Sequence, residues 1–448
     1  MSSELLAPLD LAFWHLESTG HPMHLGALTF FGSAEGVRSD DEVLDLLATR
    51  ASAIHRLRMQ VRDVLLPVGG AAWSVAQDFD VTRHVHHVRL PAGDFTAAAT
   101  GIAGELMERP LERGLPPWEM YLLTGEPGGP FAVLVKLHHA LADGMRAVAI
   151  GAGIFDEIAG ARGMRARRSR PVPASSWRSV PGQLIGFARD RIDDLGNAVG
   201  VGASVVRASR FDSRGMPALA AGSSGTRRLG TVALDLDDVQ RVRKAVGGTA
   251  NDVLLAIVAG ALRRWTRERG DLLPTADPRA LVPVSRRRPG SPAGSGNRLS
   301  AYLVDLPVSD PDPRSRLDAV RIAMNRNKAA GPMRGAGAVA VLADQLPPLA
   351  HRFGAPLAGG AARMLFDVLV TSVPLPRSAL SLGGCPLLSI YPMAPLARGQ
   401  SLAVALTTYD GQVHVGLVAD GKAVPDLDRL ARSLEDELAE LLDMALTL

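Results

Sequence analysis

The chain has 448 residues, of which 47% are hydrophobic, and its formal net charge is +3. This length exceeds what one ordinary hydrophobic core organises, so two domains are expected. Cys385 is the only cysteine, which excludes a disulfide framework and a thiolate metal cluster and fits a reducing, cytoplasmic compartment. The first ten residues carry no basic region followed by an apolar run, and no stretch of about 18 apolar residues occurs. Neither a cleavable signal nor a membrane-spanning helix is therefore expected.

Hydrophobic periodicity predicts a first half, residues 1–160, in which helices pack on a sheet. Ser39 and Glu42 form a capping box that marks the start of one helix. The expected elements are strands at Leu25–Phe31, Thr82–Leu90 and residues 131–137, and helices at residues 39–53, Asp94–Glu108 and residues 145–154.

The composition changes between residues 161 and 228, where arginine, proline, serine and glycine dominate. We expect this segment to be a crossover linker between two halves. The basic cluster Arg162–Arg170 is either a solvated part of the linker or a site of attraction to an anionic membrane surface. A weakly amphipathic segment, Leu184–Val206, is expected to pack on the protein, with the membrane surface as the alternative. Nucleic-acid binding is not expected, because no nucleic-acid module is recognisable.

A second α/β half is predicted over residues 229–448. The Asp410-Gly411 pair predicts a tight hairpin turn, and apolar residues at 427, 430, 434, 438 and 441 make one face of a closing helix. The expected elements are strands at Thr231–Leu236, Ala280–Ser285, Leu299–Leu306, Leu365–Val373, Ser401–Tyr409 and Gln412–Val418, and helices at Asn251–Arg267, Arg314–Lys328 and Asp426–Leu446. Two halves of similar size indicate a pseudo-dimer with a cleft where they meet.

Two adjacent histidines, His138 and His139, end the buried strand at residues 131–137. Neighbouring strand residues point to opposite faces, so one imidazole can face a cavity while the other supports it from behind. A neutral imidazole is a suitable base near physiological pH and could deprotonate an alcohol that attacks an activated acyl group. Asp143 either orients an imidazole or, as we favour, holds the strand–helix turn in shape. Gly144 would allow a bulky ligand close to the backbone.

Other candidate chemistry is weaker. No Gly-x-Ser-x-Gly motif is present, which argues against a serine lipase. His84, His86 and His87 could in principle bind a metal from one strand, but no carboxylate or cysteine stands at ligand spacing beside them. We expect no metal site there, and we expect Cys385 to be structural.

His138-His139-Ala-Leu-Ala-Asp143-Gly144 resembles the HHxxxDG motif of the coenzyme A-dependent acyltransferase superfamily. Taken together, the ordered motifs resemble those of the bacterial wax ester synthase/diacylglycerol acyltransferase family over nearly the whole chain. The segments that carry this resemblance are residues 8–10, 21–26, 110–113, 117–119, 248–253, 282–285, 296–298, 371–374, 391–395, 420 and 425–426.

The resemblance implies two chloramphenicol acetyltransferase-like α/β sandwich halves that form a pseudo-dimer around a central channel. It implies that His139 is the general base and that His138 and Asp143 support it. Acyl-CoA would be a co-substrate, with no further cofactor, and a long-chain alcohol or diacylglycerol would accept the acyl group. Residues assigned to substrate binding are Gly144, Asn251, Asp252, Thr371 and Ser372. For Asn251 the role of helix N-cap is an equal alternative.

The chain departs from the family pattern where Thr-Asn-Val-Pro-Gly-Pro is usual, since Ser372 replaces the asparagine and Leu375 the glycine. These departures bear on the acceptor more than on activity. The alternatives are therefore acylation of a specialised-metabolite hydroxyl or amine, such as a polyketide hydroxyl, or a non-catalytic acyl-CoA or lipid-binding protein. The expected location is the cytoplasm, with peripheral contact to the inner face of the membrane or to a lipid droplet.

Overall fold

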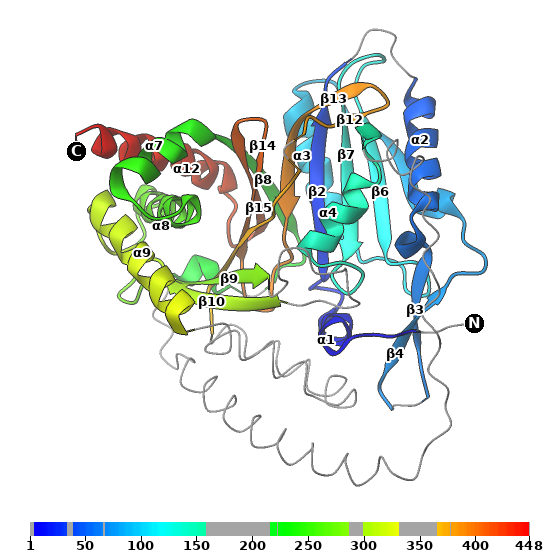
Figure 1. Cartoon of the computed structure of the whole chain (residues 1–448), viewed down its shortest axis with the longest axis horizontal. Coiled ribbons are helices and arrows are strands. Elements are labelled where there is room, and N and C mark those ends of the chain that lie inside the picture. Colours follow the sequence, from blue (N-terminus) through cyan, green and yellow to red (C-terminus); the bar gives the residue numbers. More distant parts are fainter. Residues whose placement is uncertain are drawn as a thin grey trace.

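Two six-stranded sheets form the frame of the protein (Figure 1). The computed structural model describes residues 4–33, 39–65, 68–157, 216–221, 223–285, 299–330, 365–376 and 378–447. Within these ranges both halves of the chain contain mixed sheets flanked by helices, which confirms the predicted α/β class. Most of the predicted crossover, including Arg162–Arg170 and Leu184–Val206, lies outside the described residues.

The N-terminal sheet carries the histidine pair on one of its central strands. Its strand order is β12 (Ser381–Leu382), β13 (Cys385–Met393), β2 (His24–Phe31), β7 (Phe131–His138), β6 (Trp118–Thr124) and β5 (Val85–Arg89). β2 and β7 are antiparallel, and their register sets His24 opposite His138 and Phe31 opposite Phe131. The motif therefore lies at the same end of the sheet as the start of β2.

The C-terminal sheet has the strand order β10 (Leu299–Asp305), β9 (Arg279–Ser285), β11 (Val368–Ser372), β14 (Leu402–Tyr409), β15 (Gln412–Asp420) and β8 (Arg227–Asp235). Four strands of each sheet repeat one pattern. In the N-terminal sheet β5 and β6 are parallel, and the pairs β6–β7 and β7–β2 are antiparallel. In the C-terminal sheet β11 and β14 are likewise parallel, and the pairs β14–β15 and β15–β8 are antiparallel. This repetition is the structural form of the predicted pseudo-dimer.

Helices cover the outer faces and also fill the space between the sheets. The helices are α1 (Pro8–Leu16), α2 (Asp40–Ala53), α3 (Phe95–Glu108), α4 (Gly144–Ala152), α7 (Leu236–Val246), α8 (Ala250–Glu268), α9 (Pro313–Ala330) and α12 (Leu427–Leu446), with 3-10 turns at His55–Arg58, Val81–Arg83 and Pro217–Leu219. α7, α8, α9 and α12 pack together on the outer side of the C-terminal sheet (Figure 1). α3 packs against β2 and β7 on one side and against β8 of the other half, so a shared apolar core joins the halves.

Local signals in the sequence set several element ends correctly. Ser39 accepts the Glu42 amide and Glu42 accepts the Ser39 amide, which confirms the predicted capping box of α2. Asp94 caps α3 as its predicted position implies. The predicted apolar face of α12 is buried along its whole length, with exposures of 0–6% at the five leucines that form it. Asp410 and Gly411 both have positive φ, as the hairpin turn between β14 and β15 requires.

One segment crosses the boundary expected from chain order. β12 and β13 follow the C-terminal strand β11 in sequence, yet β13 pairs with β2 and extends the N-terminal sheet. At this seam Gly416 of β15 approaches β13 so closely that a Cβ atom there would lie 1.9 Å from the Pro392 carbonyl oxygen. Only a residue without a side chain fits such a contact. The two halves are therefore interlocked as well as packed together.

A small three-stranded sheet was not predicted. It consists of β1 (Glu4–Leu5), β4 (Ala71–Val75) and β3 (Met59–Asp63), and it lies near the N-terminus beside α1 (Figure 1). In the part of the chain that the structure describes, no single helix is long and apolar enough to cross a membrane. The bent pair α7 and α8, with 102° between them, passes that test only when taken together.

Candidate active site

The end of β7 places the two histidines in different environments. His138 is fully buried, whereas His139 is half-buried and lines a cavity. This is the division that alternation along a strand predicts for two adjacent residues. The His139 backbone N–H donates to the Met23 carbonyl oxygen at 2.8 Å, which ties the end of β7 to the segment before β2. Of the pair, His139 is therefore the residue that can meet a substrate.

The hydrogen bonds of His138 fix the tautomer that its ring adopts. Its Nδ1 accepts the Ala140 backbone N–H at 3.0 Å, so in the neutral ring the proton is on Nε2. Nε2 lies 3.5 Å from Glu17 Oε1. Burial lowers the pKa of His138 to about 3, against the opposing charge of Glu17, so the ring is neutral at physiological pH. His138 thus packs behind the turn and does not line the cavity.

Glu17 is the centre of a buried polar network that the sequence analysis did not identify. His24 Nε2 lies 3.2 Å from Glu17 Oε1, and Arg113 Nη2 donates to Glu17 Oε2 at 2.5 Å. Burial by itself would raise the pKa of Glu17, but the His24 contact and the charges of His138, His24 and Arg113 outweigh it and lower the pKa to about 2. Arg113 also stacks its guanidinium 3.8 Å above the Trp14 ring. A charged carboxylate is thereby held directly behind the motif.

The only sequence signal for this network was that His24, Arg113 and His138 lie in segments that carry the family resemblance, whereas Glu17 lies between two of them. Glu17 follows the opening Pro8-Leu9-Asp10 segment, and His24 belongs to the segment at residues 21–26. No spacing rule links residues 17, 24, 113 and 138. They meet because α1 ends beside the point where the first residue of β2 pairs with the last residue of β7.

The ring of His139 is positioned by an aromatic side chain of α1. Phe13 stacks on it with ring centroids 4.0 Å apart and planes inclined by 25°. Burial lowers the pKa of His139, and the charge of Asp143 opposes that shift. A neutral imidazole with a carboxylate nearby is suited to accept a proton and to carry the resulting positive charge briefly.

Asp143 holds the strand–helix turn. It is the N-cap of α4, and its side chain accepts the Arg146 backbone N–H at 2.7 Å. Asp143 is 3% exposed. This is the role that the sequence favoured over orienting an imidazole, and the electrostatic effect on His139 accompanies it.

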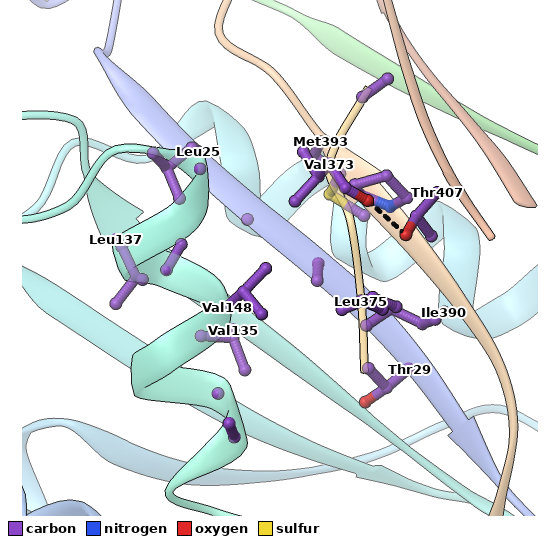
Figure 2. Close-up of a pocket in the computed structure, with 18 of the residues that line it drawn as sticks. Leu25, Thr29, Val135, Leu137, Val148, Val373, Leu375, Ile390, Met393 and Thr407 are labelled. Atoms are coloured by element: carbon purple, nitrogen blue, oxygen red, sulfur yellow. Dashed lines mark hydrogen bonds between the residues drawn. The ribbon is translucent and has the colours of Figure 1, made fainter. Parts of the chain in front are cut away.

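An apolar cavity of about 410 Å³ opens at His139 between the two halves. Figure 2 shows Leu25, Leu137, Val135 and Val148 on one side of it, and Val373, Leu375, Met393 and Thr407 on the other. Two of its hydroxyls are paired with backbone: Thr407 donates to the Val373 carbonyl at 2.6 Å and Thr29 to the Val133 carbonyl at 2.9 Å. Among the described residues that line the cavity, His139 is the only titratable one.

The structure brings three of the predicted binding residues to this cavity. Gly144, Thr371 and Ser372 all line it. A Cβ atom at Gly144 would lie 3.6 Å from the Val373 side chain, so the two halves touch at the turn after the motif. Leu375, the departure noted in the sequence, also lines the wall. The predicted cleft between the halves is thus present at the histidine pair.

Asn251 and Asp252 are not among the lining residues. Thr249, and not Asn251, is the N-cap of α8, and Asp252 completes a capping box by accepting the Thr249 backbone N–H at 2.8 Å. Asp252 therefore has a structural role at the head of a buried helix, and a substrate contact of this pair stays a prediction. The sequence places a Thr-x-x-Asp pattern there, which is itself a capping signature.

The His84, His86 and His87 group is engaged in packing. His84 Nδ1 lies 2.9 Å from the Trp118 carbonyl oxygen and its ring stacks on Trp118 at 4.6 Å, while His87 Nε2 lies 2.8 Å from Thr124 Oγ1. Within the described ranges, no group of three histidine, cysteine or acidic side chains could hold a metal ion. Cys385 is buried in β13.

Comparison with known proteins gives concordant results. A family model described as the wax ester synthase/diacylglycerol acyltransferase catalytic domain matches residues 6–254, and the WS/DGAT C-terminal domain matches residues 295–442. The probable diacylglycerol O-acyltransferase tgs1 of Mycobacterium tuberculosis is 30% identical over 453 residues, which cover 97% of this chain and 95% of that protein.

Solved structures agree with this assignment of the fold. The wax ester synthase/diacylglycerol acyltransferase from Marinobacter aquaeolei VT8 is 25% identical, with a TM-score of 0.71 over 98% of this chain and 99% of that one. The starter condensation domain of the rhizomide synthetase RzmA in complex with C8-CoA shares the fold at 16% identity, with a TM-score of 0.59 over 98% of this chain and 96% of that one. The predicted two-half acyltransferase fold is thereby confirmed.

Proposed function

We propose roles for the site residues of this chain, which belongs to the wax ester synthase/diacylglycerol acyltransferase family. The protein is an acyl-CoA-dependent acyltransferase of that type. It transfers an acyl group from coenzyme A to an acceptor, with an ester and free coenzyme A as products. One observation carries the assignment of residues: an apolar cavity between the halves has His139 as its only titratable lining residue among those described.

His139 is the general base of the reaction. It takes the proton of the acceptor hydroxyl while the oxygen attacks the thioester carbonyl carbon. The carbon–sulfur bond then breaks, and the imidazolium returns the proton to the departing thiolate sulfur. General-base assistance of this kind contributes about 10²–10⁴ in rate. No covalent enzyme intermediate is needed, since the acceptor attacks the thioester directly.

His138 and Asp143 act through His139. Neutral His138, bonded to the Ala140 amide and set against Glu17, fixes the backbone turn that directs His139 into the cavity. Asp143 holds the start of α4 and supplies a negative charge that favours the imidazolium form of His139. We propose that acyl-CoA serves as co-substrate without any further cofactor.

The test of the catalytic role is release of free thiol from palmitoyl-CoA with hexadecanol and with diacylglycerol. His139→Ala should lower the rate at least 10²-fold. His55→Ala is the matched control, because His55 is exposed in a 3-10 turn away from the cavity lining. Equal rates in His139→Ala and the parent protein would refute this role.

The acceptor is a long-chain alcohol or diacylglycerol. The apolar lining supports a hydrophobic acceptor, because a polar one would lose hydration and gain few partners. Ser372 and Leu375 in the wall favour the second candidate, an acceptor of different shape such as a polyketide hydroxyl or an amine. An acceptor screen with one acyl-CoA, read by mass spectrometry, separates these; tight acyl-CoA binding without turnover on any acceptor would instead indicate a non-catalytic binding protein.

We further propose a cytoplasmic protein in peripheral contact with the inner membrane face or a lipid droplet. The support is the water-insoluble class of substrate and the basic residues 162–170, which lie outside the described residues. Liposome flotation with anionic vesicles at low and high salt tests it, since an electrostatic attachment weakens as salt screens it. Failure to float at either salt concentration would refute membrane contact.

A further inference from the structure

The cavity continues from His139 along one face of the N-terminal sheet. Alternate residues of a strand share a face, and apart from Gly26 the lining follows that alternation on both central strands. The residues concerned, here called the chain groove, are Leu25, Ala27, Thr29 and Phe31 of β2 and Val133, Val135 and Leu137 of β7. The intervening residues Leu28, Phe30, Ala132 and Leu134 belong to the core on the opposite face, against α3.

α4 forms the outer wall of the chain groove without filling it. Gly144, Ala147 and Gly151 lie on the lining side, three or four residues apart, and so share one helix face. A Cβ atom at Gly151 would meet no atom within 4 Å. The small residues of α4 therefore leave a space between the helix and the sheet that the protein itself does not occupy.

The length of the chain groove suits a lipid hydrocarbon chain. Leu25 and Phe31 are six residues apart on β2, which corresponds to about 20 Å at roughly 3.3 Å per residue. The hydrocarbon core of a bilayer is about 30 Å thick and contains two leaflets, so one lipid chain spans about 15 Å. An extended chain of that length fits between the motif and the far end of β2.

Aromatic rings close the far end. Phe31 stacks on Phe131 with centroids 4.9 Å apart, and the Phe155 ring lies 6.2 Å from Phe31. Phe31 and Phe155 both line the cavity, and both are buried. Rings packed against each other in this way form a stiff wall, because interiors are close-packed.

We propose that the chain groove holds one extended hydrocarbon chain of a substrate, with its reacting end at His139 and its terminal methyl against Phe31 and Phe155. These two rings then set the longest chain that the enzyme accepts. The inference rests on the proposed acyltransferase function and adds to it the place of one chain and the residues that measure its length. The chain comes either from the acyl-CoA or from the alcohol, and the experiment distinguishes the two.

Shortening the groove is the first test. Gly151 lies seven residues beyond Gly144, about 10 Å along α4 at 1.5 Å per residue, so Gly151→Leu blocks the groove partway. Each methylene denied burial costs about fourfold in binding. We expect the rate ratio of palmitoyl to octanoyl substrate to fall by more than tenfold. Gly101→Leu is the matched control, because Gly101 is an exposed glycine of α3 whose Cβ would also meet nothing within 4 Å.

Lengthening the groove is the second, opposite test. Phe155→Leu and Phe155→Ala remove part or all of the end wall, and we expect both to raise the rate on chains longer than palmitoyl relative to palmitoyl itself. The more conservative leucine variant covers the case in which the alanine variant does not fold.

Two substrate series identify the source of the chain. Acyl-CoA length is varied with hexadecanol held constant, and alcohol length is varied with palmitoyl-CoA held constant. A shift in one series assigns the groove to that substrate and supports the proposal. Displacement of a fluorescent fatty acid by palmitate and by octanoate measures chain-length preference without turnover. This binding assay therefore tests the groove even if the parent protein transfers no acyl group. Unchanged preference in both series and in displacement, for Gly151→Leu and Phe155→Leu alike, would overturn it.

Discussion

The buried carboxylate behind the histidine pair gives a quantitative prediction. Glu17→Gln keeps the volume of the side chain but removes the charge that Arg113 and His24 contact. The glutamine oxygen can still accept from Arg113, so the variant isolates the electrostatic contribution of the carboxylate. We expect a protein that folds but is less stable at neutral pH.

The size of the effect follows from the pKa of Glu17. It falls from 4.5 to about 2 although burial opposes the shift, and the side chain is only 5% exposed. Each pKa unit corresponds to about 1.4 kcal/mol, but the charge of His138 that contributes to the shift exists only at low pH. At pH 7 the ion pair with half-exposed Arg113 and the His24 contact remain, so the ionised form contributes on the order of 1 kcal/mol to the free energy of unfolding. Because the folded pKa is the lower one, this contribution is complete above pH 4.5 and is lost as the pH falls towards 2.

Urea denaturation followed by tryptophan fluorescence measures the prediction. At pH 7 Glu17→Gln should unfold at a lower urea concentration than the parent protein, and the gap should narrow steadily below pH 4.5. Glu105→Gln is the control, since Glu105 is exposed on α3 and its substitution should leave the midpoint unchanged at every pH. Equal stability of Glu17→Gln and the parent at pH 7, or a gap that does not depend on pH, would show that the network carries no electrostatic stabilisation.

Three further predictions concern the histidine pair. Phe13→Leu keeps apolar volume but removes the π face stacked on His139, so we expect kcat/KM to fall about tenfold and the acidic limb of its pH profile to move to lower pH. Phe13→Tyr should restore both values, whereas full activity of the leucine variant would show that Phe13 only packs against His139. Asp143→Ala should cost about 1 kcal/mol of stability, which Asp143→Ser recovers by capping α4; the serine variant should still show a lowered acidic limb, because the charge that raises the pKa of His139 is absent. His138 has a pKa of about 3 in the folded protein and 6.5 in the unfolded chain, so between these pH values only the unfolded chain binds the extra proton. The contribution of His138 to the free energy of unfolding therefore falls by about 1.4 kcal/mol per pH unit as the pH drops through that range. In His138→Gln this component of the pH dependence, measured by urea denaturation, should disappear.

Local elements were predictable wherever a short-range rule governs them. The capping box at Ser39, the Asp94 cap of α3, the turn at Asp410 and the apolar face of α12 all depend on residues within a few positions of one another. The division between His138 and His139 was predictable for the same reason, since the pleat of a strand sends neighbours to opposite faces.

Asn251 and Asp252 show what motif resemblance leaves open. The pair was expected at the substrate, but Asp252 closes a capping box with Thr249 and neither residue lines the cavity. Resemblance transfers a sequence pattern, whereas the Thr-x-x-Asp spacing already had a local physical explanation. The alternative prediction of Asn251 as helix N-cap was wrong, because Thr249 is the N-cap and accepts the Asp252 backbone N–H.

The sequence by itself determined the α/β class, the helix and strand periods, the chemistry of a neutral imidazole and the membership of an acyltransferase family. Only the tertiary structure decided that Glu17, His24 and Arg113 meet behind His138, that Phe13 stacks on His139, and that β13 joins the N-terminal sheet. Apart from Glu17 and His24, which are seven positions apart, those contacts link residues about a hundred or more positions apart. They depend on how sheets register and pack, and no local spacing rule carries that information.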